Sequence, residues 1–269
     1  MSKAAPIATL KSLLKERILV IDGAMGTAIQ DRRLGPEDFG GAEYEGCNEY
    51  LVLTRPDVIA DIHQGFLDAG ADILETDTFG ATSVVLAEYN LAHLARRINK
   101  EAAQLARRLA DAASTPAKPR FVAGSMGPTT KTISVTGGIT FDQLAAAYHQ
   151  QAAGLMEGGA DVLLLETSQD TLNVKAGLEG IDRAFAELGR SVSVAVQGTI
   201  EPMGTLLAGQ DAEALYTSLA HRDLLWIGFN CATGPEFMTD HVRTLAALSS
   251  FPVACIPNAG LPDEDGKYH

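Results

Sequence analysis

The chain has 269 residues, of which 46% are hydrophobic and 20% charged, so it can bury the core of one large domain or two small ones. Its net charge of −13 argues against nucleic acid or an anionic membrane as a general partner. No apolar stretch reaches the roughly 18 residues of a membrane-spanning helix, and the first ten residues lack the apolar core of a secretory signal. Three widely spaced cysteines make a poor disulfide framework and indicate a reducing, cytoplasmic location.

Short apolar runs alternate with longer helical patterns along the chain, which predicts βα units and a parallel sheet. Several runs are almost wholly apolar, as strands covered on both faces should be. Amphipathic patterns predict helices over Asp57–Ala69, Leu91–Ala113 and Phe141–Glu157. The predicted strands are, in chain order, Ile18–Asp22, Ile73–Thr78, Phe121–Ser125, Val162–Thr167, Val192–Gln197, Leu225–Asn230 and Val253–Pro257.

Seven predicted strands are one fewer than a (β/α)8 TIM barrel needs, and a single barrel is common at this chain length. We therefore expect an α/β fold of this type, one domain over residues 1–269, with the eighth strand and its following segment missing from this chain. After Gly260 the tail is polar and acidic and has neither strand nor helix pattern. Residues 31–51, with four glycines and Cys47, are predicted to form a long loop after the first strand that could wall an active site.

Two segments of the chain, Gly70–Thr76 and Gly159–Thr167, resemble each other. In both, a helix ends at glycine, an aspartate opens a strand, and the strand ends in Glu-Thr. Gly-Ala-Asp alone is a common loop, because glycine suits the C-cap of a helix. The repeated Glu-Thr adds specificity, and we interpret the two segments as equivalent turns of one barrel.

Polar residues follow the predicted strands at their carboxyl ends, where the active site of a βα barrel lies. After the first strand, Asp22 could hold an ammonium group, and backbone N–H groups at Gly23 could hold a carboxylate. Glu166, at the end of the fourth strand, could be a second ammonium ligand. The alternative roles are a helix cap for Asp22 and a buried ion pair for Glu166. We interpret Glu75 as a carboxylate that organises a loop.

Cys231 is the candidate metal ligand, because it follows Asn230 at a strand tip, outside the apolar run. A lone cysteine in a strand is more often a core residue, and we predict that role for Cys255, which lies inside an apolar run. Cys47 is interpreted as incidental. Catalytic zinc usually takes three protein ligands, of which cysteines at strand tips supply one here; Asn258 is a weaker candidate for an oxygen ligand.

Six motifs spread along the chain are Ile21–Thr27, Gly70–Thr78, Ala123–Thr132, Glu166–Asn173, Gly228–Cys231 and Pro257–Pro262. Together they resemble the N-terminal, homocysteine-binding barrel of cobalamin-dependent methionine synthase, from about Leu14 to the C-terminus. The Gly-Pro-Thr-x-Lys-Thr loop and the Glu-Thr-x-x-Asp-Thr-x-Asn run are more similar to this enzyme than to homocysteine methyltransferases that use betaine or S-methylmethionine.

The resemblance implies a zinc site with three cysteines. The first maps onto Cys231; the other two belong to a Gly-Gly-Cys-Cys-Gly motif after the eighth strand, which this sequence does not reach. It also implies that Asp22, Gly23 and Glu166 bind the amino-acid end of homocysteine. Zinc would make homocysteine a thiolate, which attacks the methyl group of methylcobalamin and gives methionine and cob(I)alamin, without a side-chain acid or base. The implied partners are the cobalamin-binding and folate-binding domains of the same enzyme.

Three other functions are weighed against this one. A homocysteine methyltransferase could use betaine or S-methylmethionine as the donor. The chain could also be an inactive structural or docking fragment, because an open barrel leaves strand edges unpaired. A Schiff-base lyase would need a desolvated lysine at a strand tip, and Lys131 and Lys175 lie elsewhere.

Overall fold

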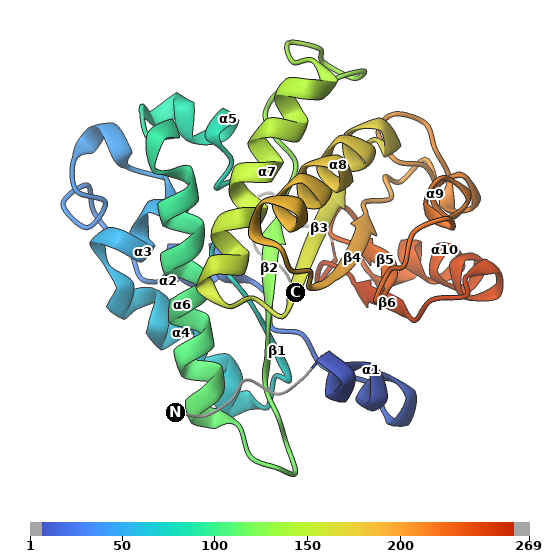
Figure 1. Ribbon diagram of the computed structural model, residues 1–269, viewed down its shortest axis with the longest axis horizontal. Helices are drawn as coiled ribbons and strands as arrows, with labels where there is room; N and C mark the ends of the chain where they lie inside the picture. Colours follow the sequence, from blue (N-terminus) through green and yellow to red (C-terminus); the bar gives the residue numbers. More distant parts are fainter. Residues whose placement is uncertain (1–6, 261–269) are drawn as a thin grey trace.

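The computed structural model describes residues 7–260. In this part of the chain, six parallel strands form one sheet whose order follows the sequence, with helices on its outer face (Figure 1). The prediction of an α/β fold with a parallel sheet is confirmed, and the sheet curves as part of a barrel. The strands are β1 (Ile73–Glu75), β2 (Phe121–Met126), β3 (Val162–Ser168), β4 (Ser193–Gly198), β5 (Ile227–Asn230) and β6 (Val253–Ile256).

The first predicted strand, Ile18–Asp22, is not a full strand in the structure. It contributes one parallel bridge, between Ile21 and Ile73. The side chains of Ile18 and Val20 are 88% and 55% exposed, because the described residues place no strand on the other side of this segment. Residues 261–269, for which no further strand is predicted, lie outside the described residues, as do the last two residues of the sixth motif.

The helices of the described part connect the strands, and capping residues mark where several of them begin. Pro56 occupies the first turn of α4, where no amide donor is needed. Thr140 and Gln143 form a capping box at the start of α7. The α-helices are α1 (Ile7–Glu16), α2 (Met25–Asp31), α3 (Leu51–Thr54), α4 (Pro56–Ala69), α5 (Ser83–Leu86), α6 (Ala95–Ala113), α7 (Phe141–Gly158), α8 (Thr171–Leu188), α9 (Ala212–Leu219) and α10 (Pro235–Leu248). Four short 3-10 helices complete the set: η1 (Ala42–Tyr44), η2 (Asn48–Tyr50), η3 (Ala87–Tyr89) and η4 (Ala92–Leu94).

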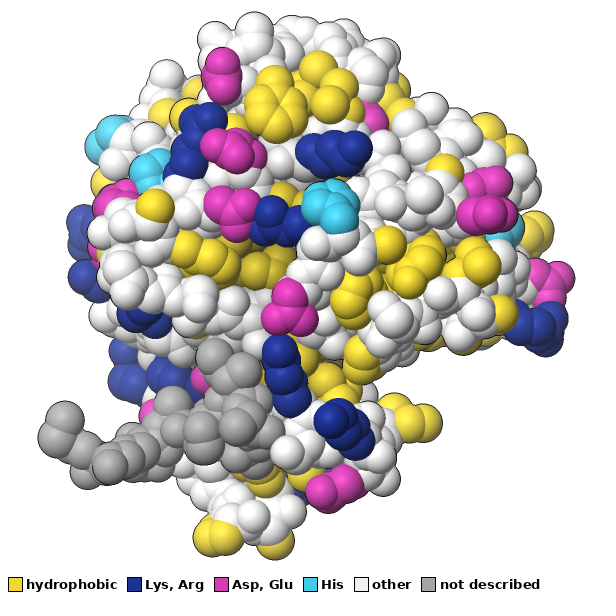
Figure 2. Space-filling view, turned by 45° about the vertical axis from the view of Figure 1, so that its right-hand side comes forward, with side chains coloured by type: hydrophobic (Ala, Val, Ile, Leu, Met, Phe, Trp, Pro, Cys, Tyr) yellow, Lys and Arg dark blue, Asp and Glu magenta, His cyan; other side chains and the backbone are white. Residues whose placement is uncertain are grey.

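Helices α6, α7 and α8 pack side by side on the outer face of the sheet (Figure 1). Glycine allows this close approach: a Cβ at Gly158 of α7 would lie 2.4 Å from the carbonyl oxygen of Lys100, and one at Gly180 of α8 would lie 2.5 Å from that of Ala145. No helix among the described residues is long and apolar enough to cross a membrane. On the face shown in Figure 2, acidic and basic side chains are interspersed, and exposed hydrophobic side chains gather in patches between them.

The inner face of the sheet has an apolar lower layer and a polar upper layer. Side chains of β3 alternate between the two faces, so Val162 and Leu164 face the interior and Glu166 lies above them on the same face. The lower layer includes Phe121 and Trp226 and is covered by Leu10 from α1. The upper layer therefore places polar groups at the carboxyl ends of the strands.

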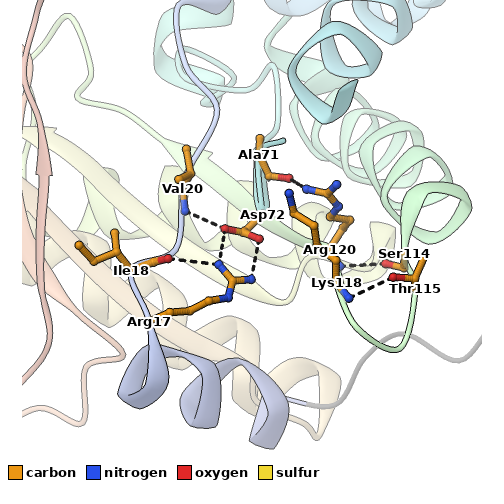
Figure 3. Close-up of polar contacts among 9 residues, drawn as sticks. All are labelled: Arg17, Ile18, Val20, Ala71, Asp72, Ser114, Thr115, Lys118 and Arg120. Atoms are coloured by element: carbon orange, nitrogen blue, oxygen red, sulfur yellow. Dashed lines mark hydrogen bonds and ion pairs between the residues drawn. The ribbon is translucent and has the colours of Figure 1, made fainter. Parts of the chain in front are cut away.

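The two similar Gly-Ala-Asp segments have the same structural role. The carboxylate of Asp72 accepts hydrogen bonds from both terminal nitrogens of Arg17, each at 2.8 Å, and from the backbone N–H of Val20 at 3.0 Å (Figure 3). Asp161 likewise accepts from Arg107 at 2.6 Å and from the backbone N–H of Val122 at 2.8 Å. Each aspartate thus joins the start of its own strand to the segment before it in the sheet: the bridge segment for Asp72 and β2 for Asp161.

The prediction that Cys255 is a core residue is wrong, because its side chain is exposed. Its Sγ lies 3.7 Å from the Sδ of Met238 on α10. However, β6 pairs only with β5 in the described part of the chain, so even the apolar Val253 and Ile256 are only half-buried. Cys47, interpreted as incidental, is buried instead, with 1% exposure.

The Asp72→Ala variant should lose about 2 to 3 kcal/mol of unfolding free energy, because the backbone N–H of Val20 and the guanidinium of Arg17 lose their acceptor. Asp240→Ala, which removes an exposed pair with Arg243, is the control and should change stability by less than about 0.5 kcal/mol. Urea unfolding followed by circular dichroism measures both. Equal effects of the two substitutions would contradict the role of Asp72.

Candidate active site

A cavity of about 710 Å³ lies at the carboxyl ends of the strands. Its walls come from the ends of β1, β2, β3, β5 and β6 and from the segments that follow the first bridge and precede α3. The structure brings together all five residues that the sequence singled out for binding: Asp22, Gly23, Glu166, Cys231 and Asn258 all line this one cavity.

The cavity is strongly acidic. Among the described residues that line it, none is Lys, Arg or His, so its negative charge has no cationic side chain opposite it. Such a cavity favours a ligand that carries positive charge, because a cation would relieve the repulsion among the carboxylates. The carboxyl groups that line it are those of Asp22, Glu49, Glu75, Asp77 and Glu166.

Asp22 is fixed at the edge of the cavity by two contacts. Its Oδ1 accepts a hydrogen bond from the backbone N–H of Glu75 at 2.6 Å, and its Oδ2 lies 3.6 Å from Nδ1 of His63. The side chain is almost wholly buried. Burial raises the pKa of Asp22 above its usual value, while His63 and the backbone N–H of Glu75 act in the opposite direction.

Gly23 lies between Asp22 and α2, which has only seven residues. Ala24, which precedes the helix, has a left-handed backbone with φ of 54°. A Cβ at Gly23 would meet no atom within 4 Å, so packing does not require glycine there. The role of Gly23 in binding a carboxylate stays a prediction.

The amide of Asn230 joins the groups on one side of the cavity. Its Nδ2, which carries two hydrogens, lies within hydrogen-bond distance of three acceptors: Oε2 of Glu166 at 3.1 Å, Oγ1 of Thr167 at 2.8 Å and Sγ of Cys231 at 3.2 Å. Its Oδ1 accepts from the backbone N–H of Thr167 at 2.8 Å. The other oxygen of Glu166, Oε1, accepts from Oγ of Ser125 at 2.5 Å. The carboxyl of Glu166 is therefore held at both oxygens.

The backbone at the ends of β3 and β5 is left-handed at non-glycine residues. Thr167, Cys231 and Ala232 have φ values of 51°, 59° and 56°, a conformation that costs roughly 1 kcal/mol for such residues. The backbone N–H of Cys231 donates to the carbonyl oxygen of Ile256 on β6 at 3.0 Å, which helps to hold the turn. The result is that Sγ of Cys231 and Oγ1 of Thr167 lie 3.7 Å apart, both beside the amide of Asn230.

Burial and mutual repulsion disfavour the ionised forms of the two glutamates. Burial, with the nearby charge of Asp22, raises the pKa of Glu166 to about 7, although the hydrogen bonds from Ser125 and Asn230 act in the opposite direction. Burial and the neighbouring carboxylates raise the pKa of Glu75 well above its usual value, and its Oε1 has no hydrogen-bond partner. A cation that enters the cavity would therefore ionise groups that are partly protonated near neutral pH.

Cys231 is the one cysteine of the described residues that lines the cavity. Within the described part of the chain, no group of three His, Cys, Asp or Glu side chains could hold a metal ion. Asn258 lines the same cavity and its backbone N–H donates to the carbonyl oxygen of Thr233 at 3.1 Å. These residues fit a zinc site only in part, since catalytic zinc usually takes three protein ligands.

Sequence reasoning placed Asn230 and Ser125 at strand ends but assigned them no contacts. The alternation of β2 and β3 could have indicated that Ser125 and Glu166 share the inner face. The cavity wall also includes Asn48 and Glu49 from residues 31–51, where η1 and η2 interrupt the predicted loop. Glu75, interpreted as a loop-organising carboxylate, anchors Asp22 through its backbone N–H while its carboxyl lines the cavity.

Comparison with known proteins decides the family. A family model described as homocysteine S-methyltransferase matches residues 19–269. The chain belongs to the homocysteine S-methyltransferase family. This assignment makes the protein a methyltransferase of homocysteine, and it agrees with an acidic cavity that holds a thiol.

Solved structures of this family share the fold. The homocysteine methyltransferase MmuM from Escherichia coli, in its metallated form, superposes with a TM-score of 0.77 at 22% identity, over 93% of this chain and 87% of that chain. Its oxidised form gives a TM-score of 0.76, also at 22% identity, over 93% of this chain and 85% of that one. At this identity the likeness shows the fold alone.

The Glu166→Gln variant should gain stability relative to the parent protein as pH rises. Glu166 has a pKa of about 7 in the folded protein and an ordinary value near 4.3 when unfolded. Its contribution to stability is therefore present at low pH and is lost between about pH 4 and 8, by up to about 4 kcal/mol. Glutamine does not ionise, so the variant avoids this loss.

Urea unfolding of both proteins at several pH values between 5 and 8 measures the difference. The control is Glu187→Gln on the surface, because ion pairs with Arg96 and His149 lower the pKa of Glu187 and give the opposite sign. A difference between the Glu166→Gln variant and its parent that does not change with pH would contradict this account of the cavity.

Proposed function

We propose that the protein binds homocysteine in this cavity and presents its sulfur for methylation, as the homocysteine-binding module of a cobalamin-dependent methionine synthase. The observation that carries the proposal is that Asp22, Glu166 and Cys231 line one acidic cavity in a chain of the homocysteine S-methyltransferase family. The carboxylates of Asp22 and Glu166 suit the ammonium group of an amino acid, and the thiol of Cys231 lines the same cavity.

The ammonium group of homocysteine would lie between Asp22 and Glu166. Both carboxyls are buried, so a charge-assisted hydrogen bond there is stronger than one in water. Because burial raises the pKa of both groups, the bound ammonium would draw them into the ionised form. The sulfur would then point toward Cys231, whose Sγ is fixed by Asn230 and Thr167.

Zinc is the metal that we propose for the site, with Cys231 as one ligand. The described residues supply one thiolate of the three that the resemblance implies. Asn258 lines the same cavity, in the segment that pairs with the one after Cys231, and offers an amide oxygen. When bound, zinc would supply Lewis-acid stabilisation of a sulfur thiolate. The residues of this chain would bind the amino-acid end of homocysteine and orient its sulfur.

Methylcobalamin, carried by another domain of the same enzyme, is the methyl donor that we propose. The Gly127–Thr132 loop and the Glu166–Asn173 run support this donor, because their sequences resemble those of the cobalamin-dependent enzyme. Phe79 lines the cavity, and its side chain is 41% exposed. An exposed aromatic side chain at this place suits a large partner that covers the cavity and excludes water.

A donor that is itself a cation is the second candidate. Betaine and S-methylmethionine both carry a positively charged methyl-bearing atom, and the five carboxyls of the cavity exceed what one ammonium group needs. The third candidate is an inactive docking fragment, because β6 pairs only with β5 in the described part of the chain. Incubation of the protein with homocysteine and each donor in turn, with methionine measured by mass spectrometry, separates the three functions.

Asp22→Asn and Glu166→Gln should each weaken homocysteine binding by about tenfold to a hundredfold, because each removes a buried charge that pairs with the ammonium group. Isothermal titration calorimetry with L-homocysteine under reducing conditions measures the dissociation constants. Asp211→Asn, which caps α9 away from the cavity, is the control and should bind as the parent does. Unchanged affinity in both cavity variants would overturn the site assignment.

Zinc should be held loosely by the protein alone, because the described residues provide one thiolate ligand. After dialysis against metal-free buffer, we expect well below one zinc per chain, and L-homocysteine, through its own sulfur, should raise the retained amount. The Cys231→Ala variant should show neither zinc nor the rise, whereas Cys255→Ala should behave as the parent. Elemental analysis of the dialysed proteins measures this, and equal zinc in the Cys231→Ala variant would show that the metal lies elsewhere.

A further inference from the structure

His63 of α4 is a buried histidine that the proposed function does not yet use. Its side chain has 0% exposure, and neither ring nitrogen has a hydrogen-bond partner. Burial of an unpaired polar group is costly. We therefore expect a polar group near the imidazole that offsets the cost of its burial.

Within the described part of the chain, the surroundings of His63 offer one candidate partner. On α4 its neighbours Ile59 and Ile62 belong to an apolar cluster between helices. The acidic group in ion-pair range is Asp22, whose Oδ2 lies 3.6 Å from Nδ1 of the ring. The imidazole thus lies behind the carboxyl that faces the cavity.

The two oxygens of Asp22 have different partners. Oδ1 is fixed by the backbone N–H of Glu75 at 2.6 Å, whereas among residues 7–260 the imidazole is the partner in range of Oδ2. If Nδ1 carries a proton, as it does in one neutral tautomer and in the charged ring, its N–H can be directed at Oδ2. A carboxylate held at both oxygens cannot rotate, and its remaining lone pairs then have a fixed direction toward the cavity.

We propose that His63 is a positioning residue for the substrate: through Nδ1 it fixes the carboxyl of Asp22 in the orientation that receives the ammonium group of the amino acid. This inference rests on the proposed function. No bond is made or broken at His63. The distance of 3.6 Å shortens when the ammonium arrives, as polar contacts in free sites commonly do on binding.

The test compares two ligands that differ only in the amino group, L-homocysteine and 4-sulfanylbutanoate. The parent protein should prefer L-homocysteine, and calorimetric dissociation constants give the ratio of the two affinities. His63→Leu removes the N–H at similar bulk and should lower that ratio about tenfold, while the affinity for 4-sulfanylbutanoate stays within about twofold. His63→Asn keeps an N–H near the place of Nδ1 and should restore most of the ratio.

The matched control is His149→Leu, which breaks another histidine–carboxylate pair, with Glu187 at 2.6 Å on the surface. It should leave both affinities unchanged. A purely structural role for His63 would weaken both ligands equally in His63→Leu, and that result overturns the proposal, as does an unchanged ratio.

A measurement on the parent protein keeps the inference testable if His63→Leu does not fold. With ¹⁵N-labelled histidine, the Nδ1 resonance of His63, assigned by its loss in His63→Asn, should shift with L-homocysteine and not with 4-sulfanylbutanoate. The same shift with both ligands, or with neither, overturns the proposal. Failure of the proposed function is distinguishable: the parent protein would then show no preference for L-homocysteine, and the ammonium site itself would be wrong.

Discussion

The hydrogen bonds of the Asn230 amide are the contacts on which the arrangement of the cavity depends. One side chain joins the end of β3 to the end of β5 by holding Glu166, Thr167 and the sulfur of Cys231. The amide group donates through two hydrogens and accepts through one oxygen, so it can fix a carboxyl and a thiol at once. The contacts with Asn230 help to stabilise the left-handed turns at Thr167 and Cys231, because each turn directs a side chain toward the same amide.

The cavity is stable despite its charge because its carboxyls need not all be ionised. Burial and repulsion favour protons on Glu75 and Glu166, which lowers the net charge of the empty site. The arrangement exchanges some stability for the ability to bind a cation: the same groups that prefer protons when the cavity is empty become good ligands when an ammonium group enters. The acidic surface adds little to this, since its charges are exposed and screened.

Much of the fold follows from local sequence rules, and the site follows in outline. The apolar runs at 121–126, 162–168 and 193–198 become strands, since helices cover one face and the barrel interior the other. The rule that strand ends converge was enough to bring Asp22, Glu166 and Cys231 to one cavity. Local sequence patterns did not predict burial correctly where it depends on neighbours that are distant in the sequence. Ile18, Val20 and Cys255 are as apolar as core residues, yet they are exposed, because no local pattern reveals whether a strand edge is covered. The contact of His63 with Asp22 was missed for the same reason.

The most direct test of the account is the position of the ligand. A crystal structure of the protein with L-homocysteine and zinc, with sulfur and zinc located by anomalous scattering, would show where each end of the amino acid lies. We predict the ammonium nitrogen within hydrogen-bond distance of both Asp22 and Glu166, and the sulfur on the wall formed by Cys231. Homocysteine bound outside this cavity, or with its sulfur turned away from Cys231, would contradict the central claim.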